Sequence, residues 1–204
     1  MRRTAQQALP FHGGPRPNSG RPRGNRVSHA ARPRFGRPTP VHVTLRVRAH
    51  VWNLRSGRCR RRLQACFAKA RGRFGARLIE YSVLGNHLHL IVEADGHHAL
   101  ARGMQGLCIR IAKALNALMG LAGGVFDDHY FARLLRTPTE LVRAIAYVLG
   151  NFRRHFGGGA SDEHASAALP EPVRAALLAP PRGWLLREGW RRAPPREWPA
   201  AGSR

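Results

Sequence analysis

The order of elements expected from this sequence, β-α-β-β-α-β-α, predicts an α+β fold: a ferredoxin-like split βαβ unit with an antiparallel sheet and an added C-terminal helix. Three observations support this prediction. Short segments alternate apolar and polar residues, as half-buried strands do, and longer segments place apolar residues at helical spacing. Two of the strands are joined only by Gly85 and Asn86, a connection short enough for an antiparallel hairpin.

The first part of the ordered chain predicts a strand, a helix and the hairpin. Residues 41–47 (VHVTLRV) alternate apolar and polar side chains, which is typical of a strand. Residues 60–74 place apolar side chains at helical spacing and end near glycines, which indicates an amphipathic helix. Residues 77–84 and 87–93 then form the two strands of the hairpin.

The next part predicts a long helix and an interrupted strand. Residues 97–119 carry an apolar stripe at helical spacing and are followed by Gly120. Residues 125–126 and 131–135 read as a fourth strand, which the polar residues 127–129 interrupt.

The last predicted helix begins with a recognisable cap. Thr137 can cap its first turn, Pro138 fits the first helical position, and Glu140 follows three residues after the cap, as in a capping box. The helix runs to about residue 156, where three glycines follow.

The chain is strongly basic, with 35 lysines and arginines against 11 acidic residues and a formal net charge of +24. Such a charge attracts polyanions, and nucleic acid is the usual one inside cells. Nearly all of the charge is arginine beside abundant alanine, glycine and proline, which is typical of a GC-rich genome, so its sign says more than its size. No apolar run is long enough to cross a bilayer. We therefore expect a cytoplasmic, nucleoid-associated protein with no membrane partner.

Composition divides the chain into three parts. Residues 1–40 are rich in proline, glycine and arginine and hold no acidic residue, so we expect a disordered basic N-terminal arm. Residues 41–156 carry the periodic segments and form the folded domain. Residues 157–204 form a tail rich in proline, arginine and tryptophan, in which we expect one short docked piece around residues 184–190 and a loose remainder.

His87 and His89 form the most informative pair of side chains. Because side chains alternate faces along a strand, the two imidazoles point to one side while Leu88 and Leu90 point to the other. Two neighbouring imidazoles can hold a divalent metal, and such a metal can activate a phosphate. A pair of this kind alone is more often two surface histidines, so the interpretation depends on a second motif.

That second motif is Tyr147 and Asn151, which lie four residues apart in the last helix and therefore share one helix face. A phenol can attack a phosphate when a metal ion neutralises the phosphate oxygens and the substrate is held in line. The amide oxygen of Asn151 is a suitable third ligand, beside two imidazoles, for Mg²⁺ or Mn²⁺. Without the histidine pair, Tyr147 would read as a core tyrosine facing the sheet.

Residues 85–93 (GNHLHLIVE) on a strand, followed by a helix with residues 146–151 (AYVLGN), resemble the REP-associated tyrosine transposases. These belong to the single-tyrosine HUH transposase superfamily, in which HUH stands for His-hydrophobic-His. Residues 125–130 (VFDDHY) and the following Arg133 resemble the same family. The resemblance covers roughly residues 40–156, and the two motifs together are specific in order and separation.

The resemblance implies DNA transposition and recombination by an enzyme that nicks single-stranded DNA and transfers strands through a 5′-phosphotyrosine intermediate, leaving a free 3′-OH. It implies that the last helix is catalytic, that Tyr147 is the nucleophile, and that His87, His89 and Asn151 bind Mg²⁺ or Mn²⁺. Relatives often have proline after the asparagine, whereas Phe152 follows here. The implied DNA partner is a hairpin-forming palindromic repeat. Relatives include monomers and dimers that exchange catalytic helices, so a homodimer is one of two open states.

Several alternatives remain at this stage. Tyr130 is the second candidate nucleophile, and Glu93 either approaches the metal or, more commonly for such a residue, ends its strand in solvent. Five arginines around the last helix are candidate DNA-binding residues or a solvated basic face: Arg133, Arg136, Arg143, Arg153 and Arg154. The alternative function is a DNA- or RNA-binding protein of the same fold that has lost catalysis.

Overall fold

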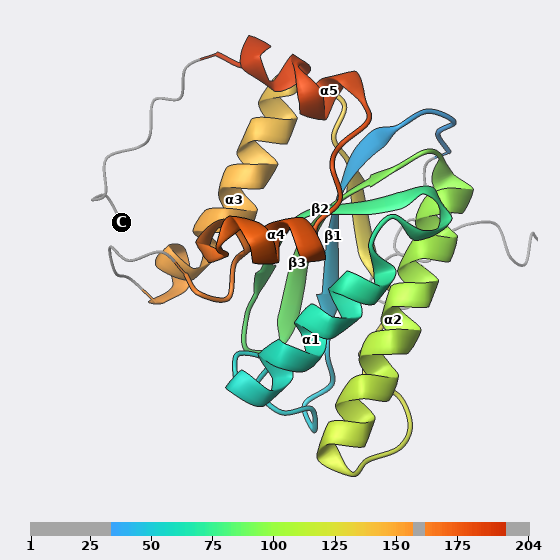
Figure 1. Ribbon diagram of the computed structural model, residues 1–204, viewed down its shortest axis with the longest axis vertical. Coiled ribbons are helices and arrows are strands. Elements are labelled where there is room, and N and C mark those ends of the chain that lie inside the picture. Colours follow the sequence, from blue (N-terminus) through green and yellow to red (C-terminus); the bar gives the residue numbers. More distant parts are fainter. Residues whose placement is uncertain (1–33, 157–161, 195–204) are drawn as a thin grey trace, which may run out of the picture.

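Four strands form one antiparallel sheet in the computed structural model, which describes residues 34–156 and 162–194, with the backbone alone for residues 151–156. The strands occur in the spatial order β2-β3-β1-β4, and all neighbouring pairs are antiparallel. Their bounds are β1 (Thr39–Arg46), β2 (Ala76–Val83), β3 (His87–Ala94) and β4 (Phe131–Leu134). This is the order of the ferredoxin-like split βαβ fold, so the predicted α+β class is confirmed (Figure 1).

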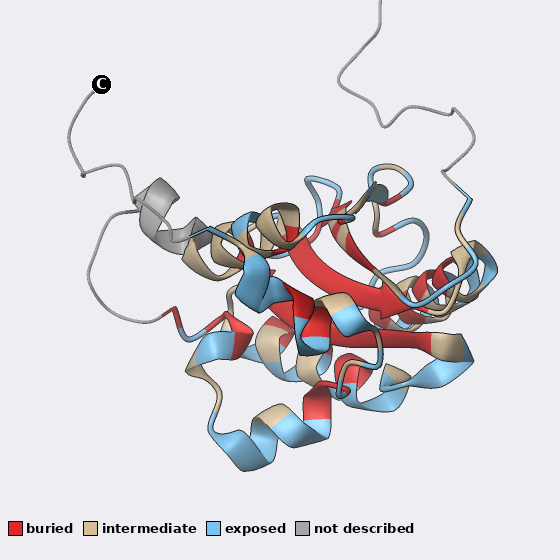
Figure 2. Cartoon of the chain, turned by 90° about the horizontal axis from the view of Figure 1, so that it is seen from above, coloured by how far each residue is buried: buried red, intermediate tan, exposed pale blue. Residues whose placement is uncertain are grey.

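Two helices, α1 (Gly57–Ala70) and α2 (His97–Met119), cover one face of this sheet. Leu88 and Leu90 of β3 point to that face and are completely buried, as the two-residue period of a strand requires. The 3₁₀ turn η1 (Arg73–Gly75) leads from the helical layer into β2. Figure 2 shows that the buried residues concentrate in the strands and on the helix faces turned toward them. Among the helices of the described residues, none combines the length and apolar character that crossing a membrane requires.

The other face of the sheet is covered by α3 (Pro138–Phe156). Its start has the predicted capping box: the Thr137 hydroxyl accepts the backbone N–H of Glu140, and the Glu140 carboxylate accepts that of Thr137, each at 3.2 Å. Leu141 and Val148, two helical turns apart on α3, are completely buried against this face beside Ile91 of β3. These contacts fix which side of α3 faces the sheet.

The fourth strand is shorter than the sequence predicts. Only Phe131–Leu134 forms β4, while Phe126 makes an isolated bridge to Val47. The polar residues between them leave the sheet in a loop, in which the Asp128 carboxylate accepts the backbone N–H of His129 at 2.7 Å. A carboxylate that binds the backbone in this way competes with strand pairing.

The C-terminal segment, residues 162–194, packs on the domain over more of its length than the sequence predicts. It contains η2 (Ser166–Ala168), α4 (Glu171–Leu177), α5 (Trp184–Arg187) and η3 (Gly189–Arg192). The segment pairs with the sheet through a bridge from Ala165 to Ser82. The expected docked piece around 184–190 is therefore one part of a longer attachment. The N-terminal arm predicted for residues 1–40 lies outside the described residues as far as residue 33.

Buried carboxylates attach this segment to the sheet. Glu93 is completely buried, accepts Arg77 Nε at 2.8 Å, and accepts the backbone N–H groups of Arg182 and Gly183 at 2.7 Å each. Asp162 receives two hydrogen bonds from Arg55, at 2.8 and 3.1 Å. The expectation that Glu93 ends its strand in solvent is therefore wrong, because backbone donors from a distant part of the chain bury its charge.

Candidate active site

His87 and His89 lie side by side on the face of the sheet that α3 covers. Their ring centroids are 4.9 Å apart and the rings are nearly perpendicular, at 86°. His89 is buried at 5% exposure, whereas His87 lies nearer the end of β3 and is partly exposed. The structure therefore brings the two predicted imidazoles together at the boundary between the interior and solvent.

Tyr147 of α3 lies directly against His89 of this pair. Its ring centroid is 5.3 Å from that of His89, edge to face at 84°. Val148, the next residue, is buried in the layer between α3 and the sheet, and it holds this turn of the helix in place. The sheet and the helix thus present the predicted nucleophile and the predicted metal ligands to each other, although the two motifs are 58 residues apart (147 minus 89).

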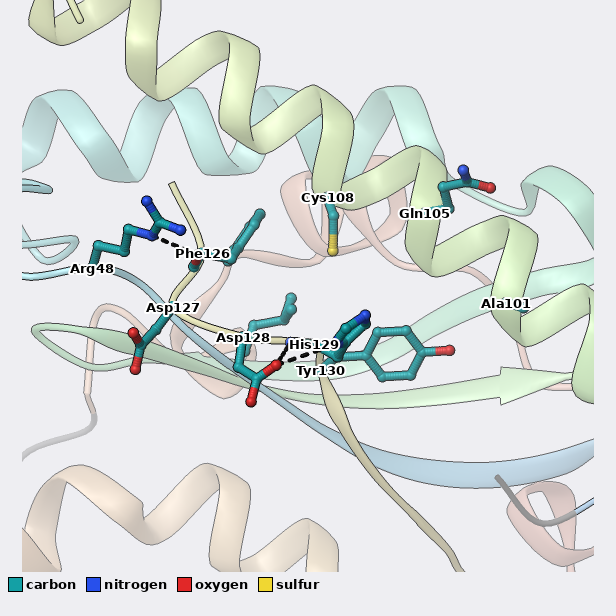
Figure 3. Close-up of a pocket in the computed structure, with 10 residues that line it drawn as sticks. Arg48, Ala101, Gln105, Cys108, Phe126, Asp127, Asp128, His129 and Tyr130 are labelled. Atoms are coloured by element: carbon teal, nitrogen blue, oxygen red, sulfur yellow. Dashed lines mark hydrogen bonds and ion pairs between the residues drawn. The ribbon is translucent and has the colours of Figure 1, made fainter. Parts of the chain in front are cut away.

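The other two tyrosines lie on the opposite face of the sheet. Tyr81 packs on Phe67 of α1, with centroids 4.8 Å apart, and burial raises the pKa of its phenol above the ordinary value. Tyr130 lines a 560 Å³ pocket between β1, α2 and the loop before β4, together with Cys108 and Gln105 of α2 (Figure 3). Both belong to the core on the α1–α2 side. The sheet therefore separates Tyr130, the second candidate nucleophile, from the histidine pair.

His42 of β1 is a third imidazole in the site, and the sequence analysis did not identify it. Its Nε2 lies 3.2 Å from Nδ1 of His89, and its ring centroid is 5.8 Å from that of Tyr147. Burial, and then the nearby positive charge of Arg133, lower the pKa of His42 below the ordinary value. The two-residue period of residues 41–47 indicates on which face of the strand His42 lies. It does not show that this face meets His89, because that depends on how β1 pairs with β3.

The hydrogen bonds of the three histidines indicate which ring nitrogens face the site. Asn86 Oδ1 accepts from Nδ1 of His87 at 2.8 Å. Nδ1 of His89 lies 3.2 Å from Thr44 Oγ1 as well as from His42. Because a neutral imidazole has one donor and one acceptor nitrogen, a donating Nδ1 leaves Nε2 as the acceptor in His87. In His89, Nδ1 is taken up by contacts within the protein, and Nε2 is the other ring nitrogen.

The remaining predicted residues fall into two groups. The side chains of Asn151, Arg153 and Arg154 lie outside the part of the chain that the structure describes, and only their place in the last turns of α3 is known. Arg133, Arg136 and Arg143 are exposed, and Arg133 lies 3.7 Å from the Glu140 carboxylate. Within the described residues, no group of three or more His, Cys, Asp and Glu side chains is arranged to hold a metal ion.

Comparison of this chain with known proteins finds similarity in the fold. No family model and no curated protein matches the chain. The fold is similar to that of a REP-associated tyrosine transposase solved with a REP hairpin, with 15% identity and a TM-score of 0.53 over 65% of this chain and 76% of that one. A candidate transposase from Deinococcus radiodurans R1 gives 13% identity and a TM-score of 0.42 over 53% of this chain and 88% of that one. At these identities the first likeness shows a shared fold, and the second supports no argument.

Proposed function

We propose that this protein is a transposase-like enzyme that cleaves and rejoins single-stranded DNA, with Tyr147 as its nucleophile. The observation that supports this most directly is the contact between Tyr147 and His89, at 5.3 Å between ring centroids. A structural tyrosine needs no histidine pair beside it, whereas a phosphate-attacking phenol needs a site that can bind and polarise the phosphate. The fold, shared with a tyrosine transposase, agrees with this reaction.

The proposed reaction is a transesterification. The phenolic oxygen of Tyr147 attacks the phosphorus of a DNA phosphodiester, the bond from phosphorus to the 3′-oxygen breaks, and the phosphate remains on Tyr147 as a 5′-phosphotyrosine. The proton lost by the phenol balances the proton gained by the departing 3′-oxygen. One phosphate ester replaces another, so a second 3′-OH can reverse the step and join a new strand. No oxidant, reductant or nucleotide cofactor is needed.

The residues around the histidine pair fit a divalent metal. Nε2 of His87 and of His89 are the nitrogens suited to coordination, and Asn86 and Thr44 orient the rings from behind, as outer partners of metal ligands do. The Ser82 hydroxyl, in register with His89, is buried with no hydrogen-bond partner among the described residues, which suits a bound water nearby. We propose that His87, His89 and Asn151 hold Mg²⁺ or Mn²⁺, which would neutralise charge on the phosphate oxygens.

The proposed substrate is a single-stranded DNA that folds into a hairpin, such as a palindromic repeat. The related fold was solved with a REP hairpin, and this chain carries a net charge of +24. A polyanion is therefore the expected partner, and binding should weaken as salt is added.

The proposal is tested by capturing the covalent intermediate. Purified protein is incubated with fluorescent hairpin oligonucleotides and Mn²⁺ or Mg²⁺, and denaturing gels are scanned for labelled protein. We expect a labelled band that chelation with EDTA prevents and that Tyr147→Phe eliminates. Tyr130→Phe is the matched control and should retain the band, because Tyr130 lies on the other face of the sheet.

The same experiment separates the enzyme from a protein that only binds nucleic acid. If the wild-type protein binds the oligonucleotides in an anisotropy assay but forms no covalent band with any of them and either metal, the catalytic proposal is wrong. A band that survives Tyr147→Phe and disappears with Tyr130→Phe would transfer the role of nucleophile to Tyr130.

A further inference from the structure

A basic pocket lies beyond the histidine site, where the chain before β1, the end of β4 and α5 meet. Its volume is 1010 Å³, at the upper end of the roughly 300–1,000 Å³ of small-ligand sites, so it can take a segment of a polymer. Its lining contains no acidic residue. It contains four arginines, which define what we call the arginine groove: Arg34, Arg37, Arg136 and Arg182.

The charges of the arginine groove are available to a ligand. All four arginines are exposed, and none of them takes part in an ion pair among the described residues. The carboxylates close to the groove bind other groups. Glu93 and Asp95 both pair with Arg77, and Glu140 accepts the backbone N–H of Arg136 at 2.7 Å. Four guanidinium groups on a common concave surface attract a polyanion strongly, and no protein carboxylate of the lining opposes this.

The wall that carries Arg182 is fixed in position. The Glu93 carboxylate accepts the backbone N–H groups of Arg182 and Gly183 at 2.7 Å each. A Cβ on Gly183 would lie 2.7 Å from Glu93 Oε1 and 3.1 Å from the carbonyl oxygen of Pro38, so only glycine lets α5 come this close to β1. The backbone of this wall is therefore held in place by the fold.

The groove also offers flat and apolar surface. Trp184 lines it at 51% exposure, with the Arg192 guanidinium over its ring at 5.1 Å, and Leu135 and Leu185 lie beneath. Aromatic rings and arginine planes are the surfaces on which unpaired bases stack. Arginines around an indole, above an apolar floor, suit a flexible nucleic-acid strand better than a compact inorganic anion.

Strand β4 connects this groove to the histidine site. Phe131, at 49% exposure, is paired with Thr44, which is in turn paired with His89. Three residues further along β4, about 10 Å at the usual rise of a strand, Leu134 lines the groove. Arg133 lies between them, paired with His42. An exposed aromatic side chain and an exposed arginine thus mark the path between the two sites.

We propose that the arginine groove binds the single-stranded DNA that continues from the cleaved phosphate, and that the strand reaches it along β4 past Phe131 and Arg133. This inference rests on the proposed function, since it assigns the flanking part of the same substrate. It predicts that DNA affinity depends on the length of single strand beside the hairpin, because only a sufficiently long flank extends from the histidine site into the groove.

The test measures binding without chemistry. Tyr147→Phe protein in EDTA is titrated into two fluorescein-labelled hairpin oligonucleotides, one with a long single-stranded flank and one with none, while anisotropy is recorded at several salt concentrations. The groove variant is Arg37→Gln with Arg182→Gln. The matched control is Arg58→Gln with Arg62→Gln, two exposed arginines of α1 on the other side of the sheet.

We expect the groove variant to bind the flanked hairpin roughly tenfold more weakly. The slope of the logarithm of its binding constant against the logarithm of the salt concentration should also become less steep by about one to two. Its affinity for the hairpin without a flank, and both affinities of the control, should change less than about twofold. Equal losses for the groove and control variants, or equal losses for both oligonucleotides, would overturn the assignment. If an RNA of the same sequence binds more tightly than the DNA, and the groove variant weakens this binding, the ligand of the groove is RNA and not DNA.

The result is distinguishable from a failure of the proposed function. If no covalent intermediate forms but the groove variant still loses affinity for the flanked hairpin alone, the groove is a DNA site and the catalytic proposal fails. If the intermediate forms normally and the groove variant binds like the wild type, the groove assignment fails alone. Thermal unfolding of both double variants checks that these exposed substitutions leave the fold intact, and Arg34→Gln provides an independent variant of the groove.

Discussion

His42 illustrates how a site residue can escape notice when only the sequence is read. His87, His89 and Tyr147 are recognisable from local spacing, because a strand and a helix each set their own side-chain periods. His42 joins them only through the register in which β1 pairs with β3, and that register is non-local. The same limit explains the misplacement of Glu93, whose partners at residues 182 and 183 are distant along the chain. Asn151 stays a prediction.

We expect His42 to be a positioning residue for His89. His42→Ala removes the ring beside Nδ1 of His89, and loss of such an outer partner typically weakens metal affinity 10- to 100-fold. Mn²⁺ affinity, measured by electron paramagnetic resonance, checks this without turnover, and nitrogen NMR shifts report the tautomer of His89. His42→Gln, which keeps an acceptor, should recover part of the affinity. Unchanged Mn²⁺ binding and an unchanged tautomer in His42→Ala would show that His42 is only a packing residue.

Among the helices and strands, α3 is predicted well from the sequence, because the residues that specify its start are neighbours in the chain. Thr137, Pro138 and Glu140 specify the first turn, and the structure has the reciprocal hydrogen bonds. The boundaries of β4 were less predictable, since strand length there depends on competition between sheet pairing and the turn at residues 127–129. The C-terminal segment was least predictable, because its short helices depend on distant carboxylates rather than on a long apolar period.

The cap of α3 has a pH dependence with a definite sign. Backbone N–H groups, first that of Arg136 and then that of Thr137, lower the pKa of Glu140 below its ordinary value. A lowered pKa means that the carboxylate stabilises the fold at and above its unfolded pKa, and that this contribution disappears as the pH falls through the lowered value. Glu140→Gln should therefore unfold more easily than wild type near neutral pH, and the two proteins should converge under acid. Urea unfolding across this range measures the difference; a constant gap would contradict the charged cap.

The packing of α2 on β2 gives a matched pair of glycine substitutions. A Cβ on Gly103 would lie 2.3 Å from the Cβ of Ala76, whereas one on Gly106 would first meet the movable side chains of Arg110 and Phe74, at 3.1 and 3.3 Å. Both changes gain about 1 kcal/mol of helix propensity, but overpacking a rigid contact costs about 1–3 kcal/mol. We expect Gly103→Ala to lower the free energy of unfolding and Gly106→Ala to leave it unchanged or raise it. The reverse order in urea unfolding would show that α2 is not this close to β2.

At the scale of the whole molecule, the two faces of the sheet carry different tasks. The face under α1 and α2 holds most of the core, and the face under α3 holds the histidines, Tyr147 and the carboxylates that attach the C-terminal segment. Glu80 of β2 belongs to the second group, through its contacts with Ser166 and Arg174. The C-terminal segment is thereby tied to the strands that carry the candidate site.

This attachment should be measurable in global stability. Glu93→Gln removes the charge from a completely buried carboxylate that Arg77 and two backbone N–H groups share, and breaking such a buried pair costs about 3–5 kcal/mol. Glu163→Gln is the control, because its pair with Arg60 is exposed and such pairs contribute about 0–1 kcal/mol. Urea unfolding followed by tryptophan fluorescence compares the two. A smaller loss in Glu93→Gln than in Glu163→Gln would contradict the structural role of the buried carboxylate.

The central claim, that the phenol of Tyr147 attacks the DNA phosphate, is tested most directly by mass spectrometry of the covalent intermediate. Wild-type protein is trapped with a hairpin oligonucleotide and Mn²⁺, then digested with nuclease and trypsin. Tyr147 falls in the tryptic peptide 144–153 and Tyr130 in the peptide 114–133, so the two sites are resolved. We predict a nucleotide phosphate on peptide 144–153, at its single tyrosine. The same mass addition on peptide 114–133, or on any residue other than Tyr147, would contradict the account.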